Sequence, residues 1–329
     1  GDFESYDQLE EMVNKALQVG EIEEGEQDVF TNLDEVLDDD YRHPIPIGIP
    51  GIDNLLKGGL AKGELGVILA PTGVGKTTVL SKIANHAFNL GYNVLQIFFE
   101  DNPKIIQRKH FTMWTGIAPD ELSFYKEEVM EKVREIREST KNKLILKKYP
   151  SDTLTMSQIK NQVRKMIAEG TKIDLIVLDY IDCIVPDKNL GDEWKSEGSV
   201  MRAYEALCHE LDVAGWTATQ GNRSSISSDV VTTDQMGGSI KKAQVGHVII
   251  SVAKSLQQKE MKLATIAITK SRIGRDGIVF ENCKFDNELM QIDTESSVTF
   301  LGLEEQKEER NRNRVNELLN KRKQQQEIN

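Results

Sequence analysis

The clearest chemical signature of the chain lies at residues 70–78, which read APTGVGKTT. Gly75, Lys76 and Thr77 have the spacing of a phosphate-binding loop, in which backbone N–H groups, a lysine and a hydroxyl surround a polyphosphate. We expect Lys76 to hold the β- and γ-phosphates of ATP and Thr77 to bind Mg²⁺. The usual signature opens with glycine, whereas Ala70 occupies that position here, where a methyl group at a strand end can be tolerated.

Three polar residues that end apolar runs are expected to complete this site. Asp179 closes LIVLD and is the expected acidic partner of Mg²⁺. Tyr180 follows it, which excludes a glutamate directly after the aspartate, so Glu100, at the end of NVLQIFF, is the predicted general base. Gln220 closes WTATQ and is predicted to sense the γ-phosphate. The residues predicted to contact the nucleotide are Ala70, Pro71, Thr72, Gly73, Val74, Gly75, Lys76, Thr77, Thr78 and Asp179.

The elements that must position these residues alternate between strand and helix, a pattern typical of an α/β fold. Such alternation predicts a mostly parallel sheet with helices on both faces, while shorter links between the later strands allow antiparallel pairing. The expected strands are 66–69, 93–99, 144–149, 175–179, 216–220 and two later segments, HVIISVAK and ATIAITK. The expected helices are 76–90, 155–170 and 199–212, with helical text over 103–140.

Composition and charge narrow the class of protein. Of the 329 residues, 39% are hydrophobic, which is enough for a core, and no run of 18 apolar residues predicts a membrane span. Three separated cysteines argue for a reducing compartment, which predicts a cytoplasmic location. The chain starts at Gly1 without a secretion signal, which predicts a fragment or trimmed form of a longer protein.

The acidity of the chain is concentrated in its amino-terminal arm. Residues 1–41 carry 15 acidic residues and one lysine, a net charge of −14. Because the whole chain has a net charge of −12, the remaining residues sum to +2. Residues 5–18 have an apolar helical face, which either folds back on its own domain or docks on a neighbouring subunit. We therefore predict an arm with a linker helix over 1–44, an ATPase domain over 45–303, and a charged tail over 304–329.

The order of these motifs resembles the RecA-type ATPase core and, within it, the motor domain of DnaB-type replicative helicases. The likeness covers about residues 45–293 and rests on LIVLDYID, TQGNR (219–223), GGSIKKA (237–243) and ITKSRIGRDG (268–277). That family's phosphate loop also begins with alanine. The family's helical amino-terminal domain has no counterpart here, so either it was removed or the protein takes a different form, as phage helicases can.

The resemblance implies a homo-oligomeric ring of six subunits that moves 5′→3′ on single-stranded DNA, with primase and a helicase loader as further partners. Arg272 would reach the neighbouring subunit's ATP site as a finger that stabilises the transition state, assisted by Lys270; Arg275 is an alternative finger. The loop 221–243 would line the pore. The predicted DNA-binding residues are Arg223, Gly237, Gly238, Ser239, Lys241 and Lys242. This loop departs from the family's pattern at Asp234, Gln235 and Met236, where the family usually has an arginine and an acidic residue. The departure concerns individual DNA contacts and not the role of the loop.

Two other functions stay open at this point. The stretch GIPGIDNLLKGGLAKGEL also resembles the text before the phosphate loop in RecA/RadA-type recombinases and in KaiC-like signalling ATPases. A recombinase should carry a short aromatic or apolar polymerisation motif before its core, for which Val29-Phe30 is a weak candidate. A KaiC-like protein often repeats its ATPase domain, whereas one GKT occurs here. The Gln-x-Asn-Arg and Lys-x-Arg pairs favour the helicase.

Overall fold

The computed structural model describes residues 29–31, 33–37, 42–187, 193–222, 225, 230–236, 240–295 and 298–302. The chain divides into two compact units, residues 1–41 and 42–329. Within the described part of the first unit lies one short helix, α2 (Leu33–Val36). The predicted linker helix over 5–18 and the predicted tail over 304–329 both lie outside the described residues.

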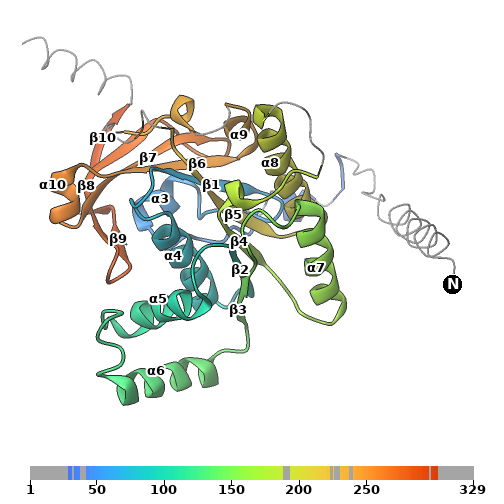
Figure 1. Ribbon diagram of the computed structural model, residues 1–329. Helices are drawn as coiled ribbons and strands as arrows, with labels where there is room; N and C mark the ends of the chain where they lie inside the picture. The colour runs from blue at the N-terminus through green and yellow to red at the C-terminus, as the bar shows by residue number, and fades with distance from the viewer. Residues whose placement is uncertain are drawn as a thin grey trace, which may run out of the picture. The chain divides into compact units, whose positions relative to one another are not determined.

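One large sheet organises the second unit (Figure 1). Its strands follow the order β10-β8-β7-β6-β1-β5-β4-β2-β3, with β9 paired to β8. The strands are β1 (Leu65–Ala70), β2 (Val94–Phe98), β3 (Leu144–Lys148), β4 (Leu175–Asp179), β5 (Ala214–Gln220), β6 (Val248–Ala253), β7 (Leu263–Ser271), β8 (Ile278–Asp286), β9 (Gln291–Asp293) and β10 (Val298–Gly302). The pairs among β1 to β6 are parallel, and β7 to β10 extend the sheet in antiparallel pairs. The predicted α/β class is confirmed.

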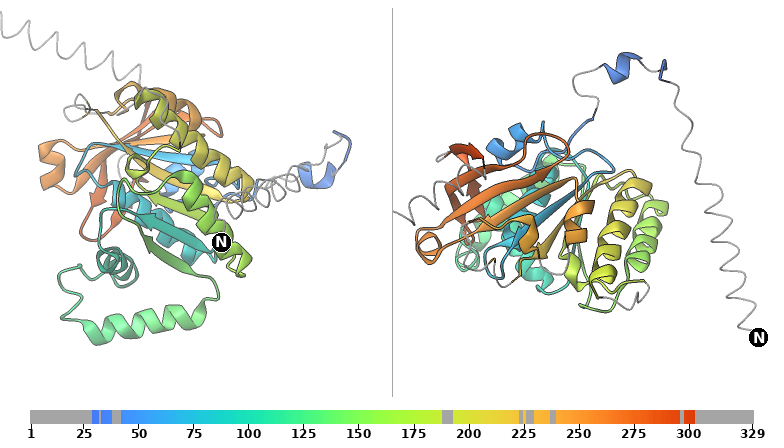
Figure 2. Two further views of the ribbon diagram at one scale, coloured as in Figure 1. Left: turned by 45° about the vertical axis from the view of Figure 1, so that its right-hand side comes forward. Right: turned by 90° about the horizontal axis from the view of Figure 1, so that it is seen from above.

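Helices lie on both faces of the sheet, with α4 and α5 on one face and α7 and α8 on the other (Figure 2). Alternate residues of β1 explain why: Ile68 and Ala70 enter one buried cluster, and Val67 and Leu69 enter the other. The helices are α3 (Pro50–Leu55), α4 (Lys76–Asn89), α5 (Pro103–Thr115), α6 (Lys126–Ser139), α7 (Met156–Ala168), α8 (Glu193–Glu210), α9 (Ile240–Val245) and α10 (Leu256–Glu260). Along the described segments, none of these helices is long and apolar enough to cross a membrane.

The helical text over residues 103–140 forms two helices rather than one. Asn102 caps the start of α5 by accepting a hydrogen bond from the Lys104 amide, and Gly116 ends it in the left-handed conformation at φ 74°. Glycine adopts this conformation without the cost that a side chain would add, so the chain leaves the helix there. A turn segment leads to α6, which stands away from the sheet (Figure 1).

Candidate active site

The predicted phosphate loop connects the end of β1 to the start of α4. Gly73 has φ 76° and Gly75, the residue before α4, has φ 125°, conformations that glycine adopts readily. A Cβ atom at Gly75 would also lie 2.5 Å from Asn287 Oδ1 and 2.8 Å from the Phe285 ring. Ala70 is fully buried in the core, where its methyl group fits without strain on the loop. The strand–loop–helix arrangement is the one that a phosphate-binding loop requires.

Lys76 and Thr77 open α4 and face acidic groups of the next strands. The Lys76 ammonium lies 3.4 Å from the Ala70 carbonyl oxygen and 5.5 Å from the centre of the Tyr180 ring. Burial lowers the pKa of Lys76, and the carboxylates of Asp182 and Asp179 oppose that shift. A cation at this position, next to backbone N–H groups at a helix start, is suited to phosphate oxygens.

Asp179 ends β4 and accepts a hydrogen bond from the Thr77 hydroxyl. Its side chain is buried, and burial raises the pKa of Asp179 from 3.8 to about 6, against the opposing effect of Thr77 and Lys109. A divalent cation bound between the two oxygen groups would favour the ionised form. Carboxylate and hydroxyl oxygens are the donors that Mg²⁺ takes when substrate phosphates supply further ligands, so these two residues fit the predicted ion.

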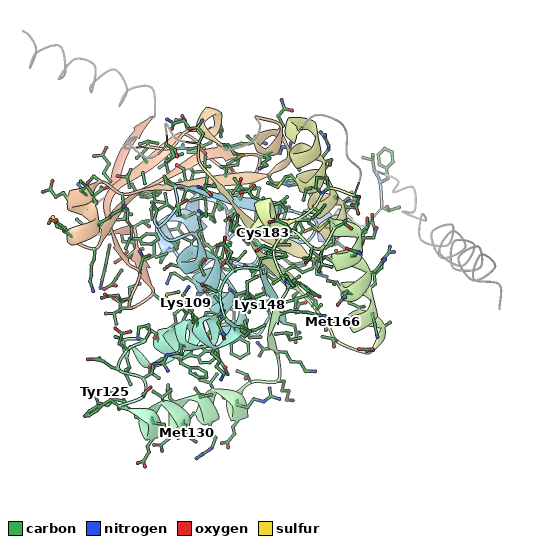
Figure 3. All side chains as sticks on the ribbon, in the orientation of Figure 1. Lys109, Tyr125, Met130, Lys148, Met166 and Cys183 are labelled. Atoms are coloured by element: carbon green, nitrogen blue, oxygen red, sulfur yellow. The ribbon has the colours of Figure 1, made fainter. Side chains whose placement is uncertain are left out.

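Glu100 lies at the same edge of the sheet as Asp179, because β2 and β4 are parallel neighbours and Phe98 pairs with Asp179. The Glu100 carboxylate is solvent-accessible and accepts a hydrogen bond of 3.2 Å from the Tyr180 hydroxyl. Lys148, labelled in Figure 3, donates from the end of β3 to the Glu100 carbonyl oxygen at 3.2 Å. The carboxylate is therefore fixed on one side and open to solvent, which a general base acting on water requires.

Gln220 ends β5, directly beside the phosphate loop. Its backbone pairs with that of Ala70, and its side-chain amide donates to the Thr72 hydroxyl at 2.6 Å. The structure thus brings Gln220 together with the loop, Asp179 and Glu100. These side chains come from four neighbouring parallel strands or the segments that follow them, whose carboxyl ends meet at one edge of the sheet.

Lys270 and Arg272 lie at the opposite edge of the sheet. Strand β7 runs antiparallel to β6, and Ser271 pairs with Val248, whose other neighbour is Gly66 at the start of β1. The two cations therefore stand about four residues, or about 13 Å, along the strands from the phosphate-loop edge. The structure does not bring them to the phosphate loop of their own chain.

Both cations are held by the end of helix α9. The Lys270 ammonium donates to the carbonyl oxygens of Ala243, Gln244 and Gly246 at 2.7, 2.9 and 2.7 Å. The Arg272 guanidinium donates to the Gln244 carbonyl oxygen at 2.7 Å. Burial, with a smaller effect of the neighbouring Arg272, lowers the pKa of Lys270 to about 8. These oxygens are the unsatisfied acceptors that a helix leaves at its carboxyl end.

Of the six predicted DNA-binding residues, Lys242 alone has a side chain that the structure describes. Arg223, Gly237, Gly238 and Ser239 lie outside the described residues, as does the side chain of Lys241. Lys242 differs from the prediction: its side chain is 3% exposed and forms an ion pair of 2.6 Å with Asp182. In this conformation a phosphate could reach the Lys242 ammonium only if that buried pair opened, which is costly because it leaves an unpaired charge.

The sequence did not identify two residues that support this site, Asn287 and Asp182. The Thr78 hydroxyl donates to Asn287 Oδ1 at 3.0 Å, so the turn after β8 braces the start of α4. Asp182 contacts both Gln220 and Lys242. A carboxylate inside the apolar run YIDCIV was a signal that a buried partner exists, but nothing local identified Lys242, which is 60 residues away.

The chain is similar in sequence to known proteins. The chain is 28% identical over 207 residues to the DnaB-like replicative helicase of Enterobacteria phage T4, an alignment that covers 58% of this chain and 42% of that protein. It is 32% identical over 99 residues to the DNA repair protein RadA of Aquifex aeolicus, covering 30% of this chain and 22% of RadA. The chain thus spans less than half the length of either relative.

A solved structure supports the fold of the chain, and a match to a sequence family shows which family the chain belongs to. The structure of a DnaB-like replicative helicase, studied with its interactions with primase, superposes with a TM-score of 0.65 at 16% identity over 77% of this chain and 62% of that one. At this identity the likeness shows the fold alone. The sequence profile of the DnaB-like helicase C terminal domain matches residues 44–294. This chain therefore belongs to the DnaB-like helicase C-terminal domain family.

Proposed function

We propose that this chain is the motor of a hexameric DNA helicase, which hydrolyses ATP to move along single-stranded DNA in the 5′→3′ direction. The observation that carries the proposal is the separation of two sets of side chains on one sheet. Lys76, Glu100 and Asp179 gather at one edge, and Lys270 and Arg272 lie at the other. A site that uses both sets needs two chains, and a closed ring of identical chains supplies such a pair at every interface.

At the phosphate-loop edge, Lys76 binds the β- and γ-phosphates of ATP. Thr77 and Asp179 would hold Mg²⁺, which would neutralise charge on the phosphate oxygens. Glu100 orients a water molecule and accepts its proton as the water oxygen attacks the γ-phosphorus. The bond from that phosphorus to the bridging β,γ-oxygen breaks, and ADP and phosphate are released. Gln220, bonded to Thr72 of the loop, senses whether the γ-phosphate is present.

Arg272 completes the site of the neighbouring chain, and Lys270 assists it. Charge on the γ-phosphoryl oxygens grows in the transition state, and a guanidinium supplied by another subunit stabilises it. Both side chains bond here to neutral carbonyl oxygens. A phosphate oxygen is a stronger acceptor for these cations than a carbonyl oxygen, so docking of a neighbour favours the exchange.

The segment 221–243 is the proposed DNA contact. It follows Gln220 directly and ends in α9, so it connects the proposed γ-phosphate sensor to the helix that holds Lys270 and Arg272. Backbone N–H groups of Gly237 to Ser239 and the charge of Lys241 suit phosphates, which fits binding without base recognition. Because a similar solved helicase was studied with primase, we also propose primase, and a loader, as partners.

Mixing two inactive variants tests the two-chain site. Arg272→Ala keeps the phosphate-loop edge, and Glu100→Gln keeps the finger, so mixed oligomers should contain some interfaces that regain hydrolysis. Mixing Glu100→Gln with Lys76→Ala is the matched control, because both changes damage the same edge and no interface is whole. ATP hydrolysis would be followed across mixing ratios with single-stranded DNA present. Recovery in neither mixture would contradict a finger supplied by a neighbouring chain.

A recombinase that pairs DNA strands is the second candidate, because the chain shares a 99-residue segment with RadA at 32% identity. Electron micrographs with ATP and single-stranded DNA separate the two. We expect closed or spiral six-membered rings and unwinding of a forked duplex. Long filaments and exchange of strands between homologous duplexes would favour the recombinase. Hydrolysis that does not respond to DNA would favour a signalling ATPase of the KaiC-like kind.

A further inference from the structure

Asp182, in the one-turn helix η1 (Ile181–Cys183), connects two regions that the proposed mechanism treats separately. Its carboxylate accepts hydrogen bonds from the Thr219 hydroxyl at 3.0 and 3.1 Å and from the backbone N–H of Gln220 at 2.9 Å. It also pairs with the Lys242 ammonium at 2.6 Å. The lysine side chain is 3% exposed and the aspartate side chain 23% exposed, so the ion pair is largely removed from water.

This carboxylate links the phosphate loop to helix α9. On one side, it holds the backbone of Gln220, whose side chain donates to Thr72 in the loop. On the other side, it holds Lys242, the third residue of α9. A displacement of Gln220 toward or away from a γ-phosphate therefore changes the position of the acceptor that Lys242 needs. Separating a buried charge from its partner is costly, so we expect Asp182 and Lys242 to move together.

Helix α9 is attached at its other end to the predicted finger. The carbonyl oxygens of Ala243, Gln244 and Gly246 accept hydrogen bonds from Lys270 and Arg272. Residues 237–239, in the segment proposed to contact DNA, directly precede the helix. One short helix is thus linked through Asp182 to the predicted γ-phosphate sensor and bonded directly to the finger residues, and it follows the DNA segment in the chain.

We propose that Asp182 is a positioning residue that couples the nucleotide state sensed by Gln220 to α9 through Lys242. This inference rests on the proposed function. It assigns to the Asp182–Lys242 pair the coupling between the nucleotide state and DNA binding. A pair that only stabilises the fold would affect hydrolysis equally with and without DNA. A coupling pair affects the ratio of the two rates, because its contribution differs between the two states.

The test uses the full chain and five variants. Asp182→Asn and Lys242→Met each break the ion pair, and the double variant Asp182→Asn/Lys242→Met leaves no unpaired buried charge. Lys242→Arg keeps the charge. Asp212→Asn is the matched control, because its carboxylate pairs with Lys62 at the surface, where the two side chains are 72% and 47% exposed. Affinity for a fluorescent ATP analogue and hydrolysis with and without oligo(dT) are measured for each.

We expect Asp182→Asn and Lys242→Met to bind the analogue and to lose about fivefold or more of the stimulation by oligo(dT). The double variant should lose no more than either single variant, since both remove the same interaction. Lys242→Arg should recover stimulation, and Asp212→Asn should match the wild type. Wild-type stimulation in Asp182→Asn and in the double variant, or an equal fall of both rates, overturns the proposal.

A second readout does not depend on DNA. Trypsin cleavage within 221–243, which contains Arg223 and Lys241, should slow when a non-hydrolysable ATP analogue binds. This protection should disappear in Asp182→Asn and in the double variant, and persist in Asp212→Asn. If oligo(dT) fails to stimulate the wild type but protection behaves as stated, the helicase proposal fails and the coupling stands. Equal protection in the wild type and both Asp182 variants overturns the coupling alone.

Discussion

The two edges of the sheet hold their charged side chains in different ways. At the phosphate-loop edge, Lys76 lies among carboxylates of its own chain, and Glu100 and Asp179 come from neighbouring strands. At the opposite edge, Lys270 and Arg272 donate to neutral carbonyl oxygens at the end of α9. The first edge gathers the groups proposed to bind ATP, whereas the second presents cations whose present partners carry no charge.

This difference indicates which contacts are easily exchanged. A hydrogen bond from a charged donor to a carbonyl contributes about 1.5–3 kcal/mol net, and a phosphate oxygen adds the attraction of opposite charges, so replacing the carbonyl by a phosphate oxygen is favourable. The acidic groups are fixed by strand pairing and by Tyr180 and Thr77, and they keep their geometry without a neighbour. The comparison predicts that changes at the first edge alter binding and stability within one chain, and that changes at the second alter only catalysis between chains.

The largest effect is expected at Lys76. Lys76→Ala removes the cation for the β- and γ-phosphates, so hydrolysis should fall by about 100- to 1,000-fold, with weaker ATP binding. Lys132→Ala, at an exposed ion pair on α6, is the control and should behave as the wild type. ATP hydrolysis and binding of a fluorescent analogue measure both effects. Full hydrolysis in the Lys76 variant would show that the phosphate loop does not bind the substrate.

Two aspartates at opposite ends of β4 should respond to pH with opposite signs. Burial raises the pKa of Asp179 to about 6, so the folded state favours the protonated form and loses about 2–3 kcal/mol of unfolding free energy as pH rises from about 4 to 6. Asp179→Asn, without Mg²⁺ and ATP, should therefore be more stable than the wild type at pH 7 and show a flatter profile. Denaturant unfolding at several pH values measures this.

Asp174, which precedes β4, provides the contrast. Burial opposes its ionisation, but hydrogen bonds from Asn93 and Lys172 prevail and lower the pKa of Asp174. Its contribution to stability is present above the unfolded-state pKa and is lost as pH falls through the lower folded value. Asp174→Asn should destabilise the chain at pH 7 and lose that effect in acid. Stabilisation by this variant at pH 7 would contradict the assignment.

A smaller pair of effects is expected within the phosphate loop. At Gly75 a Cβ atom would meet Asn287 and Phe285 and would force an unfavourable φ, so Gly75→Ala should cost about 2 kcal/mol. At Gly73 nothing lies within 4 Å of the added atom, and only the positive φ acts, so Gly73→Ala should cost about 1 kcal/mol. Denaturant midpoints compare the two. Equal costs would mean that the turn after β8 does not brace the loop.

The last effect is expected at the second edge and concerns turnover rather than stability. Lys270→Met should lower the DNA-stimulated turnover number by about tenfold while leaving ATP affinity unchanged, because the side chain lies far from its own phosphate loop. Lys284→Met, on the neighbouring strand β8, is the control. Steady-state kinetics separate the two parameters. A change in ATP affinity of the isolated chain would contradict the separation of the edges.

The sequence predicted strands β1 to β7 because their signals are local, but it did not predict β8, β9 and β10. Apolar runs bounded by polar residues marked the strands, and the carboxyl ends of parallel neighbours had to bring Glu100, Asp179 and Gln220 near the phosphate loop. Their catalytic roles stay predictions. The position of Lys242 was not predictable, because a buried lysine and a DNA-binding lysine look alike in sequence, and its partner Asp182 is 60 residues away. The contact of Asn287 with Thr78 spans 209 residues and left no local signal.

The hairpin of β7 and β8 joins the two edges. The predicted finger Arg272 follows directly on β7, at the turn of the hairpin, and Phe285 near the other end of β8 contacts the chain's own phosphate loop. Each strand of the hairpin has nine residues and spans about 30 Å, so it extends beyond the roughly 13 Å that separate the two edges. In the proposed ring, the length of this hairpin would set the distance between consecutive ATP sites. A two-residue insertion in both strands would keep the face of each side chain and lengthen that spacing.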